Sequence, residues 1–108
     1  MKAKAKLRER DIEQYLVRQV QKIGGKAFKF SSPGNRAVPD RICCLPKGHV
    51  VFVECKAPGR KPTPLQARTI QAMRNHDHEV LIIDSKEMVD VFCESVLEVI
   101  KEEVQNAK

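Results

Sequence analysis

The sequence predicts an α/β fold in the order α-β-β-β-α-β-α with a mixed central sheet. Three observations support this order: an apolar stripe of helical period near the N-terminus, two β-rich runs around a Pro/Gly break, and a strand-helix-strand pattern after them. A break of that kind predicts an antiparallel hairpin over residues 39–56. The strand-helix-strand pattern predicts a right-handed crossover, which pairs strand 79–84 in parallel with the second hairpin strand.

The first helix is indicated by Ile12, Leu16, Val20 and Ile23, which recur at helical spacing, and Gly24-Gly25 predicts its end. A basic tail, residues 1–6, leads into it. Two acids compete for a place beside the buried side of this helix. At 100° per residue, Glu9 lies roughly 25° from the centre of the stripe and Glu13 roughly 65°. Glu9 is therefore better aimed inward, while Glu13 stays an alternative that is favoured as a solvated flank residue.

Residues 26–31 form the next predicted strand, and a polar turn over 31–36 leads to Pro39-Asp40. The geometry of the hairpin that follows depends on its loop. If the loop is the three residues 46–48, Asp40 lies directly across from Glu54; a two- or four-residue loop would place Asp40 opposite Cys55 instead. We expect the three-residue loop, with Gly48 in the left-handed conformation, or a bulge that gives the same register.

Because side chains alternate along a strand, Glu54 and Lys56 project from one face and Cys55 from the other. With Asp40 on the same face, two carboxylates and an ammonium group converge at the open end of the hairpin. Hard oxygen ligands of this kind suit Mg²⁺, and a lysine can act on what the metal binds. A structural alternative is that these charges only end an edge strand. The apolar run Val50-Val51-Phe52-Val53 argues against it, since it is typical of an interior strand.

The second helix begins at Thr63-Pro64-Leu65-Gln66, with Thr63 as N-cap and Gln66 as its capping-box partner. We expect its buried side to carry Leu65, Ile70 and Met73, with Arg68 and Arg74 outside. The apolar strand 79–84 is typical of a central position. A last helix runs from Lys86 to about Gln105, before a short tail at 105–108. That helix is acidic, so it would repel a polyanion such as DNA. We expect it on the side of the molecule opposite the basic residues, where it can contribute to a dimer.

Composition sets further bounds. A chain of 108 residues predicts one domain, residues 1–108, and its net charge of +6 with pI near 9.3 favours an anionic partner, most commonly nucleic acid. A basic surface that serves only solubility is the simpler alternative. No apolar run approaches the ~20 residues of a membrane span and no signal peptide is evident, so we expect a cytoplasmic protein. The four cysteines lack CxxC spacing and are assigned no metal or catalytic role through their thiols.

The residues also carry a resemblance. Pro39-Asp40 followed by Glu54-Cys55-Lys56 matches the PD-(D/E)xK nuclease signature. The surrounding residues resemble the VRR-NUC branch of that superfamily over roughly residues 7–90. The matching segments are Gly25–Phe30, Ser32-Pro33-Gly34, Val38–Arg41, Phe52–Gly59 and Gln66. The resemblance implies a restriction-endonuclease-like core and a stand-alone protein of phage or bacterial type.

The site implied by the resemblance holds Mg²⁺, with Mn²⁺ as a substitute, and needs no organic cofactor. Glu9, Asp40, Glu54 and the backbone carbonyl of Cys55 are the expected metal ligands. Lys56 is expected to position or deprotonate the attacking hydroxide and to offset charge on the phosphate. A glutamine at the position of Gln66 is implied to lie near the active site, and helix capping is an equally good account of that residue.

The expected function is metal-dependent, structure-selective cleavage of DNA, most of all of four-way (Holliday) junctions by a homodimer. Stand-alone members of the resembled family resemble Holliday-junction resolvases, and two sites related by a two-fold axis can cut two opposed strands. One alternative is a flap or single-strand nuclease. Another is a nucleic-acid-binding module that keeps the fold without turnover. A panel of DNA shapes, incubated with and without EDTA, distinguishes these three.

Overall fold

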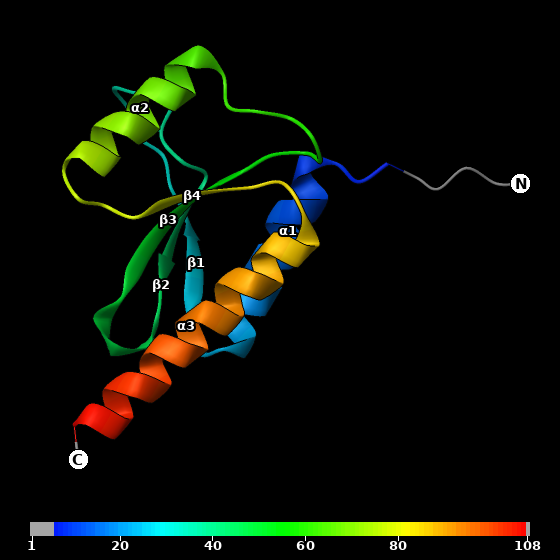
Figure 1. Ribbon diagram of the computed structural model, residues 1–108. Coiled ribbons are helices and arrows are strands. Elements are labelled where there is room, and N and C mark those ends of the chain that lie inside the picture. The colour runs from blue at the N-terminus through cyan, green and yellow to red at the C-terminus, as the bar shows by residue number, and fades with distance from the viewer. Residues whose placement is uncertain (1–5, 108) are drawn as a thin grey trace, which may run out of the picture.

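The computed structural model describes residues 6–107 and has the predicted element order (Figure 1). The elements are α1 (Glu9–Lys22), β1 (Lys26–Lys29), β2 (Arg41–Cys44), the 3₁₀ turn η1 (Pro46–Gly48), β3 (Val50–Cys55), α2 (Pro64–Asn75), β4 (Val80–Ile83) and α3 (Lys86–Asn106). Residues 1–5 of the expected basic tail lie outside the described residues. The tail expected at 105–108 is shorter than predicted, because α3 continues to Asn106.

The four strands form one mixed sheet in the order β1-β2-β3-β4. The β1–β2 and β2–β3 pairs are antiparallel, and β3 and β4 are parallel, which confirms the predicted crossover. Helices α1 and α3 lie together against one face, whereas α2 lies apart from them beyond one end of the sheet (Figure 1). The apolar stripe of α1 forms the centre of the core, since Ile12, Leu16 and Val20 are fully buried there.

The β2–β3 hairpin has the predicted register. Arg41 pairs with Val53, and the Leu45 amide donates to the His49 carbonyl at 2.8 Å, which leaves residues 46–48 as the loop. Gly48 has the expected positive φ, 78°, and Lys47 also has one, 67°. Two consecutive left-handed residues turn the chain tightly enough to keep the odd-numbered loop. By continuation of the register, Asp40 lies opposite Glu54.

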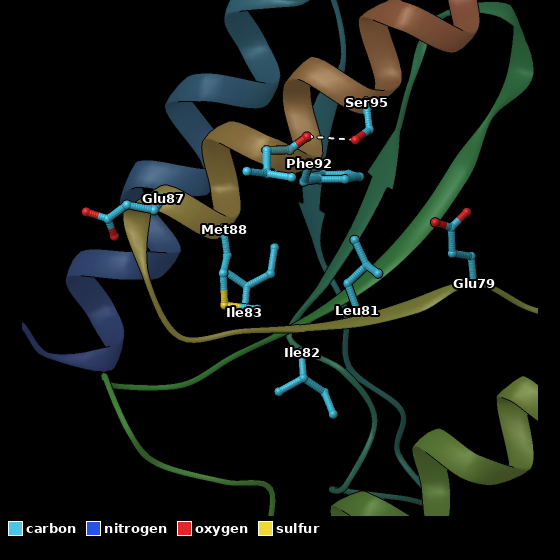
Figure 2. A pocket seen from close by; sticks show the side chains of 9 residues that line it. Glu79, Leu81, Ile82, Ile83, Glu87, Met88, Phe92 and Ser95 are labelled. Carbon is cyan, nitrogen blue, oxygen red and sulfur yellow. Dashed lines mark hydrogen bonds between the residues drawn. The ribbon is translucent and has the colours of Figure 1, made fainter.

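Strand β4 lies at an edge of the sheet, so its predicted central position is wrong. Its apolar run has two other causes. Ile83 is buried beneath α3, and Leu81 and Ile82 are half-buried beside a hollow of about 420 Å³ at the free edge. Figure 2 shows this hollow, with Leu81 and Ile83 directed toward α3 and Ile82 directed the other way. An apolar strand can therefore be an edge strand when a helix covers one of its faces.

The buried side of α2 also differs from the prediction. Ile70 is buried, but the Leu65 side chain is 52% exposed. Five residues along a helix correspond to a rotation of about 140°, so the two side chains cannot face the sheet together. Arg74 is exposed as expected, yet its guanidinium donates to the Val80 carbonyl at 2.6 and 3.2 Å. Arg74 thus ties the last turn of α2 to the start of β4.

Strand β1 is shorter than the predicted segment 26–31, because the chain leaves the sheet after Phe30 for the turn at 31–36. Among residues 6–107, the helices are all too short or too polar to cross a membrane.

Candidate active site

The candidate site lies at the open end of the β2–β3 hairpin, where the strand register places Asp40 across from Glu54. The Asp40 carboxylate does more than face its partner. Its Oδ2 accepts a hydrogen bond of 2.7 Å from the Cys55 backbone amide. The side chain therefore takes the place of a backbone acceptor just where the strand pairing ends, and this fixes one carboxylate beside the end of β3.

Glu54 is a buried carboxylate without hydrogen bonds. Glu54 is 1% exposed, and neither of its carboxylate oxygens has a hydrogen-bond partner among residues 6–107. Burial, together with the neighbouring charge of Asp40, raises the pKa of Glu54 to about 7. An ionised carboxylate in this position costs several kcal/mol unless a cation accompanies it, so the site favours a positive charge.

The ammonium group of Lys56 is at the centre of the site. Its Nζ lies 3.4 Å from Glu54 Oε2 and 3.8 Å from Glu9 Oε1. The same Nζ donates a 2.7 Å hydrogen bond to Oε1 of Gln66. Lys56 is itself buried, and its charge offsets part of the negative charge of the two glutamates.

The structure distinguishes the two acids of α1. Glu9 points into the site, where partial burial and the charge of Asp40 raise its pKa. Glu13 instead accepts hydrogen bonds from Arg41 Nε at 2.7 Å and Lys29 Nζ at 3.2 Å. The Glu13 side chain is only 13% exposed, so the favoured view of it as a solvated flank residue is wrong. Its partners sit on the opposite sheet face from Glu54, a link that the helix pattern alone does not reveal.

Gln66 caps helix α2 and also contacts Lys56 of the candidate site, so its active-site role stays a prediction. The side-chain Oε1 of Gln66 accepts from the Thr63 backbone amide at 2.9 Å. The backbone amide of Gln66 in turn donates to Thr63 Oγ1 at 3.2 Å. The oxygen that completes this capping box is the one that accepts from Lys56. Helix capping therefore holds the side chain in the orientation that the lysine needs.

The donor groups fit a hard divalent cation bound in an open site. Across the described part of the chain, no three carboxylate, imidazole or thiol groups already form a closed metal cluster. Mg²⁺ does not require one, because it commonly keeps several waters and uses one or two carboxylates plus substrate phosphates. Such an ion would explain why the buried carboxylate oxygens of Glu54 accept no hydrogen bond among residues 6–107. The Cys55 thiol is buried with a raised pKa, which leaves only its backbone carbonyl as a donor.

A basic hollow of about 420 Å³ adjoins the site at Glu9, and the sequence analysis did not anticipate it. It is lined by Lys6, Leu7, Arg8, Glu9, Ala57, Pro58 and Arg60. Lys6 and Arg8 before α1 and Arg60 in the loop after β3 are each visible in the sequence. Only the fold shows that they meet on either side of the start of α1.

Comparison with known proteins agrees with this arrangement. No family model matches the sequence. A solved structure described as "VRR_NUC domain" superimposes with a TM-score of 0.75 at 31% identity, covering 80% of this chain and 94% of that one. This chain belongs to the VRR_NUC family. The expected restriction-endonuclease-like fold is thereby confirmed.

A phage protein is also similar to this VRR_NUC chain. It is named "Putative nuclease p44", from Acyrthosiphon pisum secondary endosymbiont phage 1. The two are 51% identical over 85 residues, which make up 79% of this chain and 91% of the phage protein. The matched length is therefore nearly the whole of the phage protein.

Proposed function

We propose that this VRR_NUC chain is a metal-dependent endonuclease that hydrolyses phosphodiester bonds in DNA. One observation carries the proposal. Glu54 is a buried carboxylate whose two oxygens accept no hydrogen bond among residues 6–107, and it lies beside a second carboxylate and 3.4 Å from the ammonium group of Lys56. A purely structural role gives no reason to keep such a costly group at the end of a buried strand. The name of the phage relative and the family membership support the same activity.

The side chains divide the work. Asp40, Glu54 and Glu9, with the Cys55 carbonyl, would hold Mg²⁺ or Mn²⁺. The ion, when bound, lowers the pKa of a water molecule so that hydroxide is available near neutral pH. Lys56 lies close enough to Glu54 and Glu9 to hold that hydroxide or to offset charge on the phosphate. Gln66 positions Lys56 through its 2.7 Å hydrogen bond.

The basic hollow beside Glu9 offers a path for the DNA backbone. Lys6, Arg8 and Arg60 line it, and each can contact phosphate without reading sequence. The net charge of +6 favours the same partner. Recognition of DNA shape, and not of base sequence, is the expected outcome. The cytoplasm remains the predicted site of action.

We further propose that the preferred substrate is a four-way junction and that the active form is a homodimer joined at the β4 edge. Glu79 and Ile83 bond to β3 through their carbonyl groups, so by strand alternation the polar groups of Val80 and Ile82 point to the other edge. The Val80 carbonyl there already accepts from Arg74, so the groups of Ile82 are the ones offered for pairing. Met88 of α3 borders the same edge (Figure 2), and Val91 lines the hollow at this edge. The two residues are 41% and 61% exposed. The acidic character of α3 disfavours DNA as the occupant of this surface.

Antiparallel pairing of two β4 edges requires a two-fold axis perpendicular to the sheet. The sheet then continues from one subunit into the other. The two Glu54 side chains lie on the same face of this sheet, and the strand ends that carry the two candidate sites point in opposite directions. That arrangement suits paired cuts in one branched substrate.

The test is a panel of end-labelled DNA shapes: a four-way junction, a flap, a single strand and a plain duplex, each incubated with Mg²⁺ or with EDTA. We expect paired cuts in the junction with Mg²⁺ and none with EDTA. Cleavage of flaps alone would favour the flap-nuclease alternative. Tight junction binding without cleavage in Mg²⁺ or Mn²⁺ would favour a non-catalytic binding module.

A further inference from the structure

A second groove, of about 840 Å³, lies between the loop after β1 and helix α2, and it shares no lining residue with the basic hollow. It shares no lining residue with the polar cluster around Lys56. It is lined by Phe30, Ser32, Asn35, Val38, Leu65, Arg68, Thr69, Ala72, Met73, His76 and His78. None of the residues to which we assign metal binding, catalysis or contact with the DNA backbone lines this groove.

The floor of the groove is aromatic. The Phe30 and Phe52 rings pack with their centroids 5.6 Å apart, and His78 meets Phe52 edge-on at 6.1 Å. Phe30 and His78 both line the groove, so flat ring surfaces are available at its wall. The opposite wall carries Leu65, whose apolar side chain is 52% exposed. This combination suits a flat, largely apolar ring.

The charges of the groove suit a nucleotide. Its described lining includes the cationic Arg68 and two histidines and contains no carboxylate. Asn35 fixes its width, since its Nδ2 donates to Thr69 Oγ1 at 3.3 Å while its Oδ1 accepts from the Ala37 amide at 2.8 Å. The groove is therefore a braced, positively charged feature and not a gap between independent segments.

Each wall of the groove includes a residue that is hydrogen-bonded to a candidate catalytic residue or precedes one in the sequence. The Phe30 amide donates to the Asp40 carbonyl at 2.9 Å, so one wall continues directly from the metal-site strand. On the other wall, Leu65 precedes Gln66, which holds Lys56. A ligand in the groove thus lies next to the place where the proposed reaction occurs.

We propose that this groove binds an unpaired nucleobase next to the scissile phosphate. The inference rests on the proposed nuclease function and adds to it. A base inside a duplex cannot reach the aromatic wall, because both of its faces are stacked in the helix. Strands that open at a branch point present such a base. Preference for branched DNA then comes from the groove as well as from the arrangement of two subunits.

The experiment compares two duplexes that each carry one unpaired nucleotide at a branch, either an ordinary nucleotide or an abasic one. Affinity is measured by fluorescence anisotropy in EDTA, so that cleavage does not interfere. Because base–aromatic stacking contributes strongly, we expect the intact nucleotide to bind at least about fivefold more tightly. Equal affinity for both duplexes would overturn the proposal.

Two variants that each add one negative charge to α2 test whether the preference for the intact nucleotide arises in the groove. Ala72→Glu places a carboxylate in the groove, whereas Gln71→Glu places one on the neighbouring position of α2, outside the lining. Ala72→Glu should lose the preference for the intact nucleotide and Gln71→Glu should keep it. A preference that survives Ala72→Glu would assign the base to another place and reject the groove.

The same duplexes separate this inference from the nuclease proposal. Cleavage in Mg²⁺ without any preference for the intact nucleotide would reject the groove alone. A preference in EDTA with no cleavage in Mg²⁺ or Mn²⁺ would reject the nuclease activity and keep the groove as a nucleotide-binding site.

Discussion

At the scale of the residue, Glu54 determines the character of the site. Its pKa of about 7 means that the folded protein binds a proton more tightly there than the unfolded chain does. In metal-free solution the free energy of unfolding therefore falls as pH rises from about 4.5 to about 7, the interval in which only the folded form stays protonated. The carboxylate is then kept at the expense of stability, as is common where function needs a strained group.

Replacing Glu54 by Gln should raise the free energy of unfolding at pH 8 in EDTA by about 1–3 kcal/mol, because the buried charge is removed. Urea titration measures this. Glu13→Gln is the matched control and should destabilise the fold, since it weakens the contacts to Arg41 and Lys29. A Glu54→Gln protein less stable than the wild type under these conditions would show that the carboxylate is satisfied in the fold.

At the scale of the element, helix α2 joins stability to the site through one side chain. Gln66→Ala should remove both the capping contact and the hydrogen bond to Lys56. Thr63→Ala removes capping alone and should cost about 1 kcal/mol. We expect both variants to unfold more easily but only Gln66→Ala to lose most of its cleavage rate at saturating Mg²⁺. Equal rates in the two variants would limit Gln66 to capping.

Among the structural elements, local features can be predicted from the sequence, and the assembly of distant segments cannot. The loop at 46–48 determines the hairpin register by counting residues, so the meeting of Asp40 with Glu54 is predictable. The capping box at Thr63 is equally local. The edge position of β4 and the pairing of Glu13 with Arg41 are not, because they depend on how distant segments assemble. Leu65 lies on the wrong side of α2 for the core, and only the fold shows the groove that it lines.

At the scale of the whole molecule, the β4 edge and α3 form the surface on which the proposed dimer depends. Val91→Glu should yield a monomer at micromolar concentration, since it puts a charge into the uncovered apolar hollow. Leu97→Glu adds the same charge to another exposed apolar position of α3, outside that hollow, and should leave the dimer intact. Size-exclusion chromatography coupled to light scattering measures the mass of each variant and so distinguishes monomer from dimer. A wild-type monomer, or a dimer of Val91→Glu, would contradict this interface.

The most direct test of the central claim compares wild-type and Asp40→Ala proteins in Mg²⁺ on the labelled four-way junction. We expect the wild type to cut the junction, and Asp40→Ala to bind it but to cut no more than the wild type does in EDTA. Undiminished cleavage by Asp40→Ala would contradict it, because the reaction would then not occur where the carboxylates and Lys56 meet.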